Sequence, residues 1–156
     1  MKILMVCLGN ICRSPMAEGV MKKLIIENEL THWLVDSAGV GDWHVGELPD
    51  KRAIRCARNH GIDITDQRAR HIRKNDLERF DHILVMDQMN YQDVIAQTQN
   101  SGLHKKIRLL LDYKYPGKQR NVPDPYYTDL FEEAYQLIKE GCEAFLHHHI
   151  NNINPG

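Results

Sequence analysis

A cysteine and an arginine near the start of the chain have the spacing of an anion site that also holds a nucleophile. The apolar run at residues 3–6 predicts a strand, Cys7 follows it directly, and Arg13 stands where a helical pattern begins. In a strand–loop–helix unit, N–H groups of the loop and of the helix N-terminus point toward one position, where the helix dipole favours negative charge. That field favours the thiolate of Cys7, and the Arg13 guanidinium can hold two phosphate oxygens at once.

The residues around this pair favour a phosphate-binding loop over a buried cysteine beside a solvated helix start. Ser14 can cap the helix or hydrogen-bond the thiolate, and Pro15 suits the first helical position, where its missing N–H costs nothing. Gly9 and Asn10 tolerate the positive φ that a loop wrapped around an anion requires. Backbone amides of residues 8–13 are expected to face the phosphate oxygens. The predicted loop residues are Leu8, Gly9, Asn10, Ile11, Cys12, Arg13 and Ser14.

A carboxyl group between two prolines is the candidate acid–base partner of Cys7. Pro123 and Pro125 restrict the backbone on both sides of Asp124. By itself this pattern fits a turn aspartate. Beside a cysteine nucleophile, however, the acid can protonate the oxygen that leaves phosphorus, and the resulting carboxylate can activate water against a phosphocysteine.

Four segments of the chain resemble the low-molecular-weight protein tyrosine phosphatases. VCLGNICRSP, residues 6–15, is similar to the active-site loop of that family, and DPYY, residues 124–127, is similar to its general-acid loop. DSAG and NHGI, residues 36–39 and 59–62, also resemble family segments. The resemblance spans nearly the whole chain, and the two outer motifs together are highly specific.

The resemblance implies an enzyme that hydrolyses phosphotyrosine and aryl phosphates through a phosphocysteine on Cys7. Arg13 would hold the phosphoryl oxygens, and Asp124 would act first as acid and then as base. The implied substrates are phosphotyrosine proteins, with a tyrosine kinase as one candidate, and phosphate or other oxyanions would inhibit competitively. Nothing in these motifs suggests a metal or another cofactor.

The resemblance also implies residues that support the loop. Ser37 and Asn10 are expected to hydrogen-bond and to hold the phosphate-binding loop in its strained shape. Many family members pair an aspartate at the position of Asp87 with a histidine from an earlier loop. Gln67 stands at that histidine position here, so the sequence leaves open what replaces the buried pair.

Three aromatic residues are candidates for the walls of a substrate pocket. Trp43 lies in the glycine-rich stretch 40–47, where it either folds back onto the core or stacks on a substrate ring. The resemblance favours the second interpretation, because the family has a variable, often aromatic, residue in this loop that tunes substrate choice. Tyr126 and Tyr127 either flank the pocket or begin the last helix. Together the three rings predict a slot deep enough for phosphotyrosine and too deep for phosphoserine.

Apolar runs alternate with helical patterns along the chain, which indicates a parallel α/β sheet. Apolar stripes predict helices from residue 15 to about 29 and through 131–145, the second opened by a capping-box-like pair, Asp129 and Glu132. The family resemblance implies a three-layer fold, with a four-stranded parallel sheet, helices on both faces and the phosphate-binding loop after the first strand. The predicted strands are residues 3–6, 33–37, 82–86 and 107–111.

The length and composition fit one ordinary globular domain. We expect residues 1–156 to form it, with a loose tail from about residue 148. The three consecutive histidines at 147–149 lie where this tail begins, and we do not expect them to bind a metal, because consecutive positions on a helix do not share a face. A formal net charge of −1 gives no indication of nucleic-acid binding. No apolar run approaches the roughly 20 residues of a membrane span, so no membrane partner is expected. The cysteines show no zinc-site spacing and are expected to be thiols in the cytoplasm.

Two other classes of protein fit parts of this pattern. A thioredoxin-coupled arsenate reductase would share the fold and a similar loop, but it needs two further cysteines that relay a disulfide. Cys56 and Cys142 are far apart in the sequence, and Asp124 would have no role in that reaction. A non-catalytic phosphotyrosine-binding module would be expected to lose Cys7 or Asp124, and the chain keeps both.

Cys12 lies inside the same loop as Cys7 and is a candidate redox partner for it. It is either a small residue that packs under the loop or a thiol that captures an oxidised Cys7 as a disulfide. The family resemblance favours the second role. We therefore expect a redox-sensitive active site in which Cys7 and Cys12 form a reversible disulfide.

Overall fold

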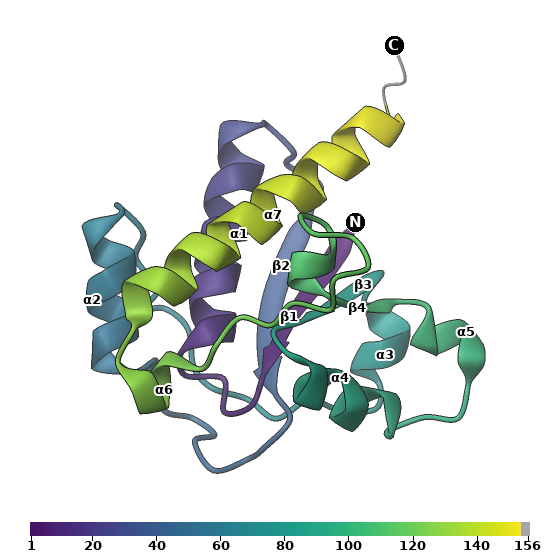
Figure 1. The fold of residues 1–156 in the computed structure, drawn as a ribbon, viewed down its shortest axis with the longest axis horizontal. Coiled ribbons are helices and arrows are strands. Elements are labelled where there is room, and N and C mark those ends of the chain that lie inside the picture. The colour runs from purple at the N-terminus through teal and green to yellow at the C-terminus, as the bar shows by residue number, and fades with distance from the viewer. Residues whose placement is uncertain (154–156) are drawn as a thin grey trace.

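The computed structural model of the protein describes residues 1–153 (Figure 1). In this part of the chain, parallel strands form a four-stranded sheet in the order β2-β1-β3-β4. β1 (Lys2–Cys7) is central, flanked by β2 (Leu34–Gly39) and β3 (His82–Val85), and β4 (Ile107–Leu109) lies at the far edge. The predicted α/β fold with a four-stranded parallel sheet is confirmed.

The central strand is buried on both faces because helices cover both. Side chains alternate along a strand, so Ile3 and Met5 join one hydrophobic cluster while Leu4 and Val6 join the other. The first cluster also contains residues of α1, α2 and α7, and the second contains residues of α3 and α4. The helices are α1 (Arg13–Glu27), α2 (Lys51–Asn59), α3 (Asp76–Arg79), α4 (Gln88–Ile95), α5 (Ser101–His104), the 3-10 helix η1 (Leu110–Asp112), α6 (Pro125–Thr128) and α7 (Phe131–Ile153).

The arrangement of these helices places α6 and α2 near the loop that follows β1, while the far end of α7 lies at the opposite end of the molecule (Figure 1). α7 packs along α1. Among residues 1–153, no helix combines the length and the apolar character that crossing a membrane requires.

The start of α1 differs from the prediction by two residues. The helix begins at Arg13 with Cys12 as its N-cap, so Pro15 is the third helical residue. Proline is tolerated there because N–H groups of the first turn have no partner within the helix. Ser14 is inside the helix and does not cap it, which leaves its hydroxyl available to the loop that follows β1.

The predicted capping pair at the start of α7 is wrong. Asp129 has a left-handed backbone, with φ of 66°, because it ends α6, and α7 begins two residues later at Phe131. The carboxylate of Asp129 pairs with Arg52 at 2.9 Å. Glu132 pairs with His60 at 2.8 Å. Both acidic side chains therefore join α6 and α7 to α2.

The predicted loose tail is also wrong for the residues that the structure describes. α7 continues to Ile153, so positions 148–153 are helical. The ring of His149 lies 4.2 Å from that of Phe145 and 4.6 Å from that of His82, measured between centroids. Aromatic contacts with the core therefore extend the helix past the apolar stripe seen in the sequence. Residues 154–156 lie outside the described part.

Candidate active site

Cys7 ends β1 at the carboxyl edge of the sheet, and the loop after it curls back to the start of α1. Of the two residues predicted to tolerate positive φ, Asn10 uses it, with φ of 58°. The end of β2 packs so closely on the loop that a Cβ atom on Gly39 would lie 2.9 Å from the carbonyl oxygen of Leu8. Glycine at this position therefore allows the loop and β2 to pack together.

The side chain of Asn10 connects the loop to β2 and α1. Its Nδ2 donates to Oγ of Ser14 at 2.7 Å and to Oγ of Ser37 at 3.0 Å. Its Oδ1 accepts from the backbone N–H of Arg70 at 3.0 Å. Ser37 donates in turn to Oε1 of Glu18 at 2.7 Å. The structure thus brings together Asn10 and Ser37, and it adds Glu18, whose role the helical pattern of the sequence did not reveal.

The hydroxyl of Ser14 lies beside the thiol of Cys7, with Oγ and Sγ 3.0 Å apart. Because Oγ already accepts a hydrogen from Asn10, its own hydrogen is free to point at the sulfur. Cys7 and Ser14 are both buried, with 3% and 0% of their surface exposed. The sulfur therefore has a fixed hydrogen-bond partner on the protein side, and this hydroxyl can donate to it when Cys7 is a thiolate.

Arg13 is buried and held by three oxygen atoms. Nη1 donates to Oδ2 of Asp87 at 2.6 Å and to the carbonyl of Val122 at 2.9 Å, and Nη2 lies 3.4 Å from Oδ2 of Asp124. Burial opposes the charged form, but Cys7 and the two carboxylates outweigh it and raise the pKa of Arg13 above its ordinary value. The guanidinium is therefore charged and fixed at the start of α1.

The structure shows what replaces the pair of Asp87 and a histidine, which the sequence had left open. Asp87 caps α4 through the N–H of Asn90 and binds Arg13, so it orients the arginine. Gln67 is buried and donates instead to the carbonyl of Pro15 at 3.0 Å. The two positions are thus used separately, one holding the guanidinium and the other holding the first turn of α1.

Asp124 is the N-cap of α6 and faces the loop across the pocket. Its Oδ1 accepts from the N–H of Tyr126 at 3.1 Å, while Oδ2 points to Arg13. The side chain is partly exposed, at 24%. A carboxyl that is fixed on one oxygen and open to solvent can exchange a proton with a ligand or with water.

A cavity of about 210 Å³ joins these groups, because Cys7, Arg13 and Asp124 all line it. We call Cys7, Asn10, Arg13 and Ser14 the floor: Cys7 and Arg13 line the cavity, whereas Asn10 and Ser14 do not line it and support Cys7 through hydrogen bonds. Leu8, Gly9, Ile11 and Cys12 of the predicted loop also line the cavity. A buried guanidinium beside a thiol in one cavity can bind a phosphoryl group and present it to sulfur.

Three aromatic side chains, Trp43, Tyr126 and Tyr127, form what we call the mouth. Trp43 does not fold back onto the core, since it is 67% exposed and its ring lies over Gly41. The tyrosines belong to the short helix α6 and not to the last helix, and their rings meet edge to face at 5.1 Å. His44 also lines the cavity, a residue that nothing in the sequence pattern distinguished.

Arg52 is, after Glu18 and His44, a third residue that the sequence analysis missed. Its guanidinium binds Asp50 at 3.0 Å and Asp129 at 2.9 Å, and it lies 3.4 Å from the carbonyl of Tyr126. The N–H of Asp50 donates to the carbonyl of Ile11 in the phosphate-binding loop. Arg52 therefore links that loop, through Asp50, to the segment that carries Asp124, and its contacts with that segment join residues more than 70 positions apart.

Comparisons with known proteins agree with this geometry. A family profile described as "Low molecular weight phosphotyrosine protein phosphatase" matches residues 2–154. The chain is 46% identical to the low molecular weight phosphotyrosine protein phosphatase of Sus scrofa, over 92% of each chain. The crystal structure of YfkJ from Bacillus subtilis matches with a TM-score of 0.91 at 40% identity, covering 97% of this chain and 96% of that one. A structure titled drosophila arginine phosphatase matches with a TM-score of 0.87 at 38% identity, covering 96% and 98%.

Proposed function

The chain belongs to the low molecular weight phosphotyrosine protein phosphatase family, and we propose that Cys7, Arg13 and Asp124 carry out its hydrolysis of phosphotyrosine. One observation carries this assignment: the buried thiol, the fixed guanidinium and the partly exposed carboxyl line the same cavity. These are the nucleophile, the oxyanion clamp and the proton donor that covalent phosphoryl transfer needs.

The first half of the reaction transfers the phosphoryl group to sulfur. The thiolate of Cys7 attacks phosphorus, an S–P bond forms, and the bond between phosphorus and the phenolic oxygen breaks. Asp124 gives its proton to that oxygen, so tyrosine leaves as a neutral phenol. Backbone N–H groups of residues 8–13 and the guanidinium of Arg13 hold the equatorial oxygens throughout.

The second half returns the enzyme to its starting state. Water attacks phosphorus, Asp124 accepts a proton from it, the S–P bond breaks, and phosphate is released. The hydroxyl of Ser14, 3.0 Å from Sγ, is placed to donate to the departing thiolate. Asp87 positions Arg13 for both halves, and it does not touch the reacting atoms.

The mouth supports a preference for aryl phosphates on proteins. Trp43, Tyr126 and Tyr127 present ring faces and edges against which a phosphotyrosine ring can pack while its phosphate reaches the floor. The shorter side chains of phosphoserine and phosphothreonine would leave the phosphate above Cys7. Phosphotyrosine proteins, with a tyrosine kinase among them, are therefore the proposed partners.

A panel of phosphorylated peptides tests this proposal. One peptide sequence carrying phosphotyrosine, phosphoserine, phosphothreonine or phosphoarginine at the same position should release phosphate rapidly only from phosphotyrosine. Phosphoarginine belongs in the panel because one solved relative is titled an arginine phosphatase. Faster release from phosphoserine or phosphoarginine would contradict the proposed slot, and trapping of ³²P on Cys7 by rapid quench would test the covalent step separately.

We also propose that the enzyme works in the cytoplasm. All four cysteines are free in the structure, and the mechanism requires Cys7 to be a thiol. Reducing compartments keep thiols in that state. Fractionation of the source cells with an antibody against the protein would test this, and recovery in an oxidising compartment would contradict it.

A further inference from the structure

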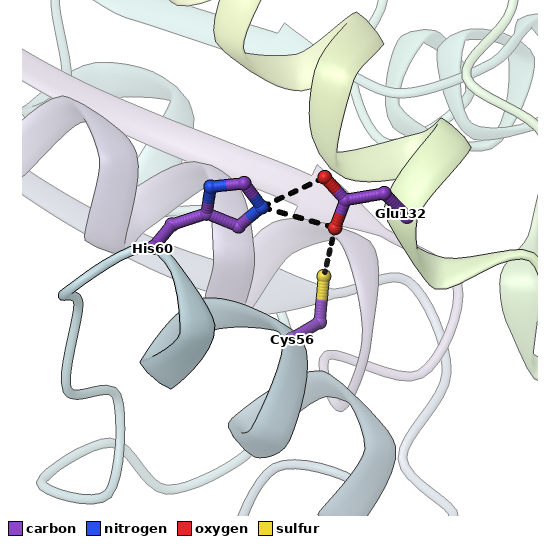
Figure 2. A group of neighbouring side chains, drawn as sticks. All are labelled: Cys56, His60 and Glu132. Carbon is purple, nitrogen blue, oxygen red and sulfur yellow. Dashed lines mark hydrogen bonds and ion pairs between the residues drawn. The ribbon is translucent and has the colours of Figure 1, made fainter.

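Three potential metal ligands meet at the contact between α2 and α7, away from the catalytic cavity. Cys56 lies on α2, His60 ends that helix, and Glu132 lies in the first turn of α7 (Figure 2). Nε2 of His60 is 2.8 Å from Oε1 and 3.0 Å from Oε2 of Glu132, and Sγ of Cys56 is 3.5 Å from Oε2. One ligand atom from each residue lies within 4.8 Å of the other two.

This spacing is close to what a tetrahedral zinc ion needs. Zn²⁺ bonds of about 2.0–2.3 Å place neighbouring ligand atoms roughly 3.3–3.8 Å apart. The present separations run from 2.8 Å between His60 and Glu132 to at most 4.8 Å within the group, so side-chain rotations would have to widen the shortest and narrow the longest to reach that range. The combination of sulfur, imidazole nitrogen and carboxylate oxygen suits Zn²⁺, whereas Mg²⁺ and Ca²⁺ prefer sites made only of oxygen.

Neighbouring side chains hold two of the three ligands in place. The ring of His60 stacks on that of Tyr135, with centroids 3.9 Å apart and planes 12° from parallel. Nε2 of Gln136 donates to Oε1 of Glu132 at 3.0 Å. Contacts of this kind orient metal ligands before the ion arrives and raise its affinity.

We propose that Cys56, His60 and Glu132 bind a Zn²⁺ ion that joins α2 to α7. A thiolate and a carboxylate together balance the two positive charges of the ion, and His60 binds as a neutral imidazole. The site is open to solvent, because the side chains of His60 and Glu132 are 29% and 59% exposed. Water can therefore occupy the fourth position of the ion.

Zinc binding releases the proton that the Cys56 thiol carries in the free site. Burial, together with Glu132, raises the pKa of the Cys56 thiol to about 11, so the ion displaces a proton from sulfur into the solvent. In the zinc-bound form Nε2 of His60 is the ligand atom and the imidazole proton is on Nδ1. Zinc affinity should therefore rise with pH across the neutral range.

The ion-paired guanidinium of Arg52, beside the site, does not oppose this assignment. Arg52 and Arg55 line the neighbouring surface cavity together with Cys56 and Glu132. The charge of Arg52 is already matched by its ion pairs with Asp50 and Asp129.

The competing explanation is a hydrogen-bonded contact between the helices that needs no ion, and Co²⁺ distinguishes the two. Co²⁺ substitutes for Zn²⁺ and gives a near-ultraviolet charge-transfer band when a thiolate binds it. The full chain, reduced and freed of metal, should bind one Co²⁺ with this band, and Zn²⁺ should displace it. The band should persist in Cys7→Ser and Cys142→Ser and disappear in Cys56→Ser.

Glu132→Gln, with Glu133→Gln as its matched control, covers the case in which Cys56→Ser fails to fold. Calorimetric titration should show at least about a tenfold loss of Zn²⁺ affinity in Glu132→Gln and none in Glu133→Gln. Zn²⁺ should also raise the unfolding temperature of the wild type and of Glu133→Gln more than that of Glu132→Gln. Absence of the cobalt band, or a band that disappears with Cys7→Ser and remains in Cys56→Ser, would overturn the proposal.

Discussion

At the floor of the catalytic pocket, Cys7, Arg13 and Ser14 are at most 3% exposed, whereas at its mouth Trp43 and Tyr127 are 67% and 76% exposed. Floor side chains are polar and hydrogen-bonded to partners from several distant segments. Mouth side chains are aromatic: Trp43 lies over Gly41, Tyr126 and Tyr127 contact each other, and the Arg52 guanidinium lies 5.5 Å from the centre of the Tyr126 ring. A buried polar group without its partners costs about 1–3 kcal/mol, so the floor tolerates little change, while the exposed mouth is free to vary.

This difference separates the chemistry from the choice of substrate. Substitutions at the floor should lower kcat, because they remove groups that act on the transferring phosphoryl group. Substitutions at the mouth should mainly raise KM for aryl substrates and leave the chemical steps intact.

The largest effect is expected for Cys7→Ser. A hydroxyl is a poor nucleophile here, so turnover should fall on the order of 10⁶-fold, as for other lost nucleophiles. Phosphate affinity, measured by calorimetry, should remain, because backbone N–H groups provide most of the cradle. Appreciable activity in a clean preparation of the variant would contradict the covalent mechanism.

The next largest effect is expected for Arg13→Lys, which should lower kcat by roughly 10³–10⁵-fold. A lysine keeps the charge, but it cannot bind Asp87, the carbonyl of Val122 and two phosphoryl oxygens at once. Steady-state kinetics together with phosphate titration would show both catalysis and binding reduced. Activity within tenfold of the wild type would mean that charge alone, without the planar geometry, is sufficient.

Asp124→Asn should lower kcat by roughly 10²–10⁴-fold on phenols that leave poorly. The loss should shrink for nitrophenyl phosphates, since their phenolates depart without a proton. A plot of log kcat against leaving-group pKa for the variant and the wild type would measure this. Equal losses across the series would show that Asp124 only positions α6.

Trp43→Ala should raise KM for phosphotyrosine peptides by about two- to tenfold, the value of one aromatic contact. Its kcat should change little. Val45→Ala is the matched control, because Val45 is exposed in the same loop and does not line the cavity. A fall in kcat with unchanged KM would show that Trp43 acts in the chemical steps, as the floor residues do, and not in substrate binding.

The sequence predicted the parts of the protein that depend on local order. Strands, the loop after β1 and the two outer motifs follow from runs and spacings of neighbouring residues. The ends of helices were predicted less well: α1 begins at Arg13, two residues before the predicted start, and its N-cap residue Cys12 makes no capping hydrogen bond through its side chain. The sequence did not reveal the partners of two acidic residues: Asp129 pairs with Arg52, and Glu132 pairs with His60, both in or at the end of a distant helix.

The same limit applies to residues that support the site. Glu18 was part of an ordinary helical pattern, and the sequence left the partner of Asp87 open. Each acquires its role from a contact across the fold, with Ser37 in one case and Arg13 in the other. Only the three-dimensional arrangement reveals such pairs, because no local periodicity or spacing encodes them.

The smallest effect on turnover is expected for Cys12→Ser, and the variant should differ from the wild type only after oxidation. Burial, aided by the charges of Asp50, Cys7 and Asp124, raises the pKa of Cys12 above its ordinary value. Cys12 therefore stays a thiol while peroxide oxidises Cys7 to a sulfenic acid and is itself reduced to water. Condensation of the two groups then forms the disulfide and releases water, and their proximity compensates for the low thiolate fraction of Cys12.

The measurement is recovery of activity after peroxide and then a thiol reductant. Wild-type enzyme should recover most of its activity, and Cys12→Ser should lose it progressively as Cys7 oxidises beyond sulfenic acid. Phosphate present during the peroxide step should protect both proteins, because it occupies the cradle in front of Cys7. Peptide mass mapping should find the link between residues 7 and 12 in the wild type alone. If both proteins recover equally and no such peptide is found, Cys12 is only a packing residue beneath the loop, and the role of Cys7 as nucleophile is unaffected.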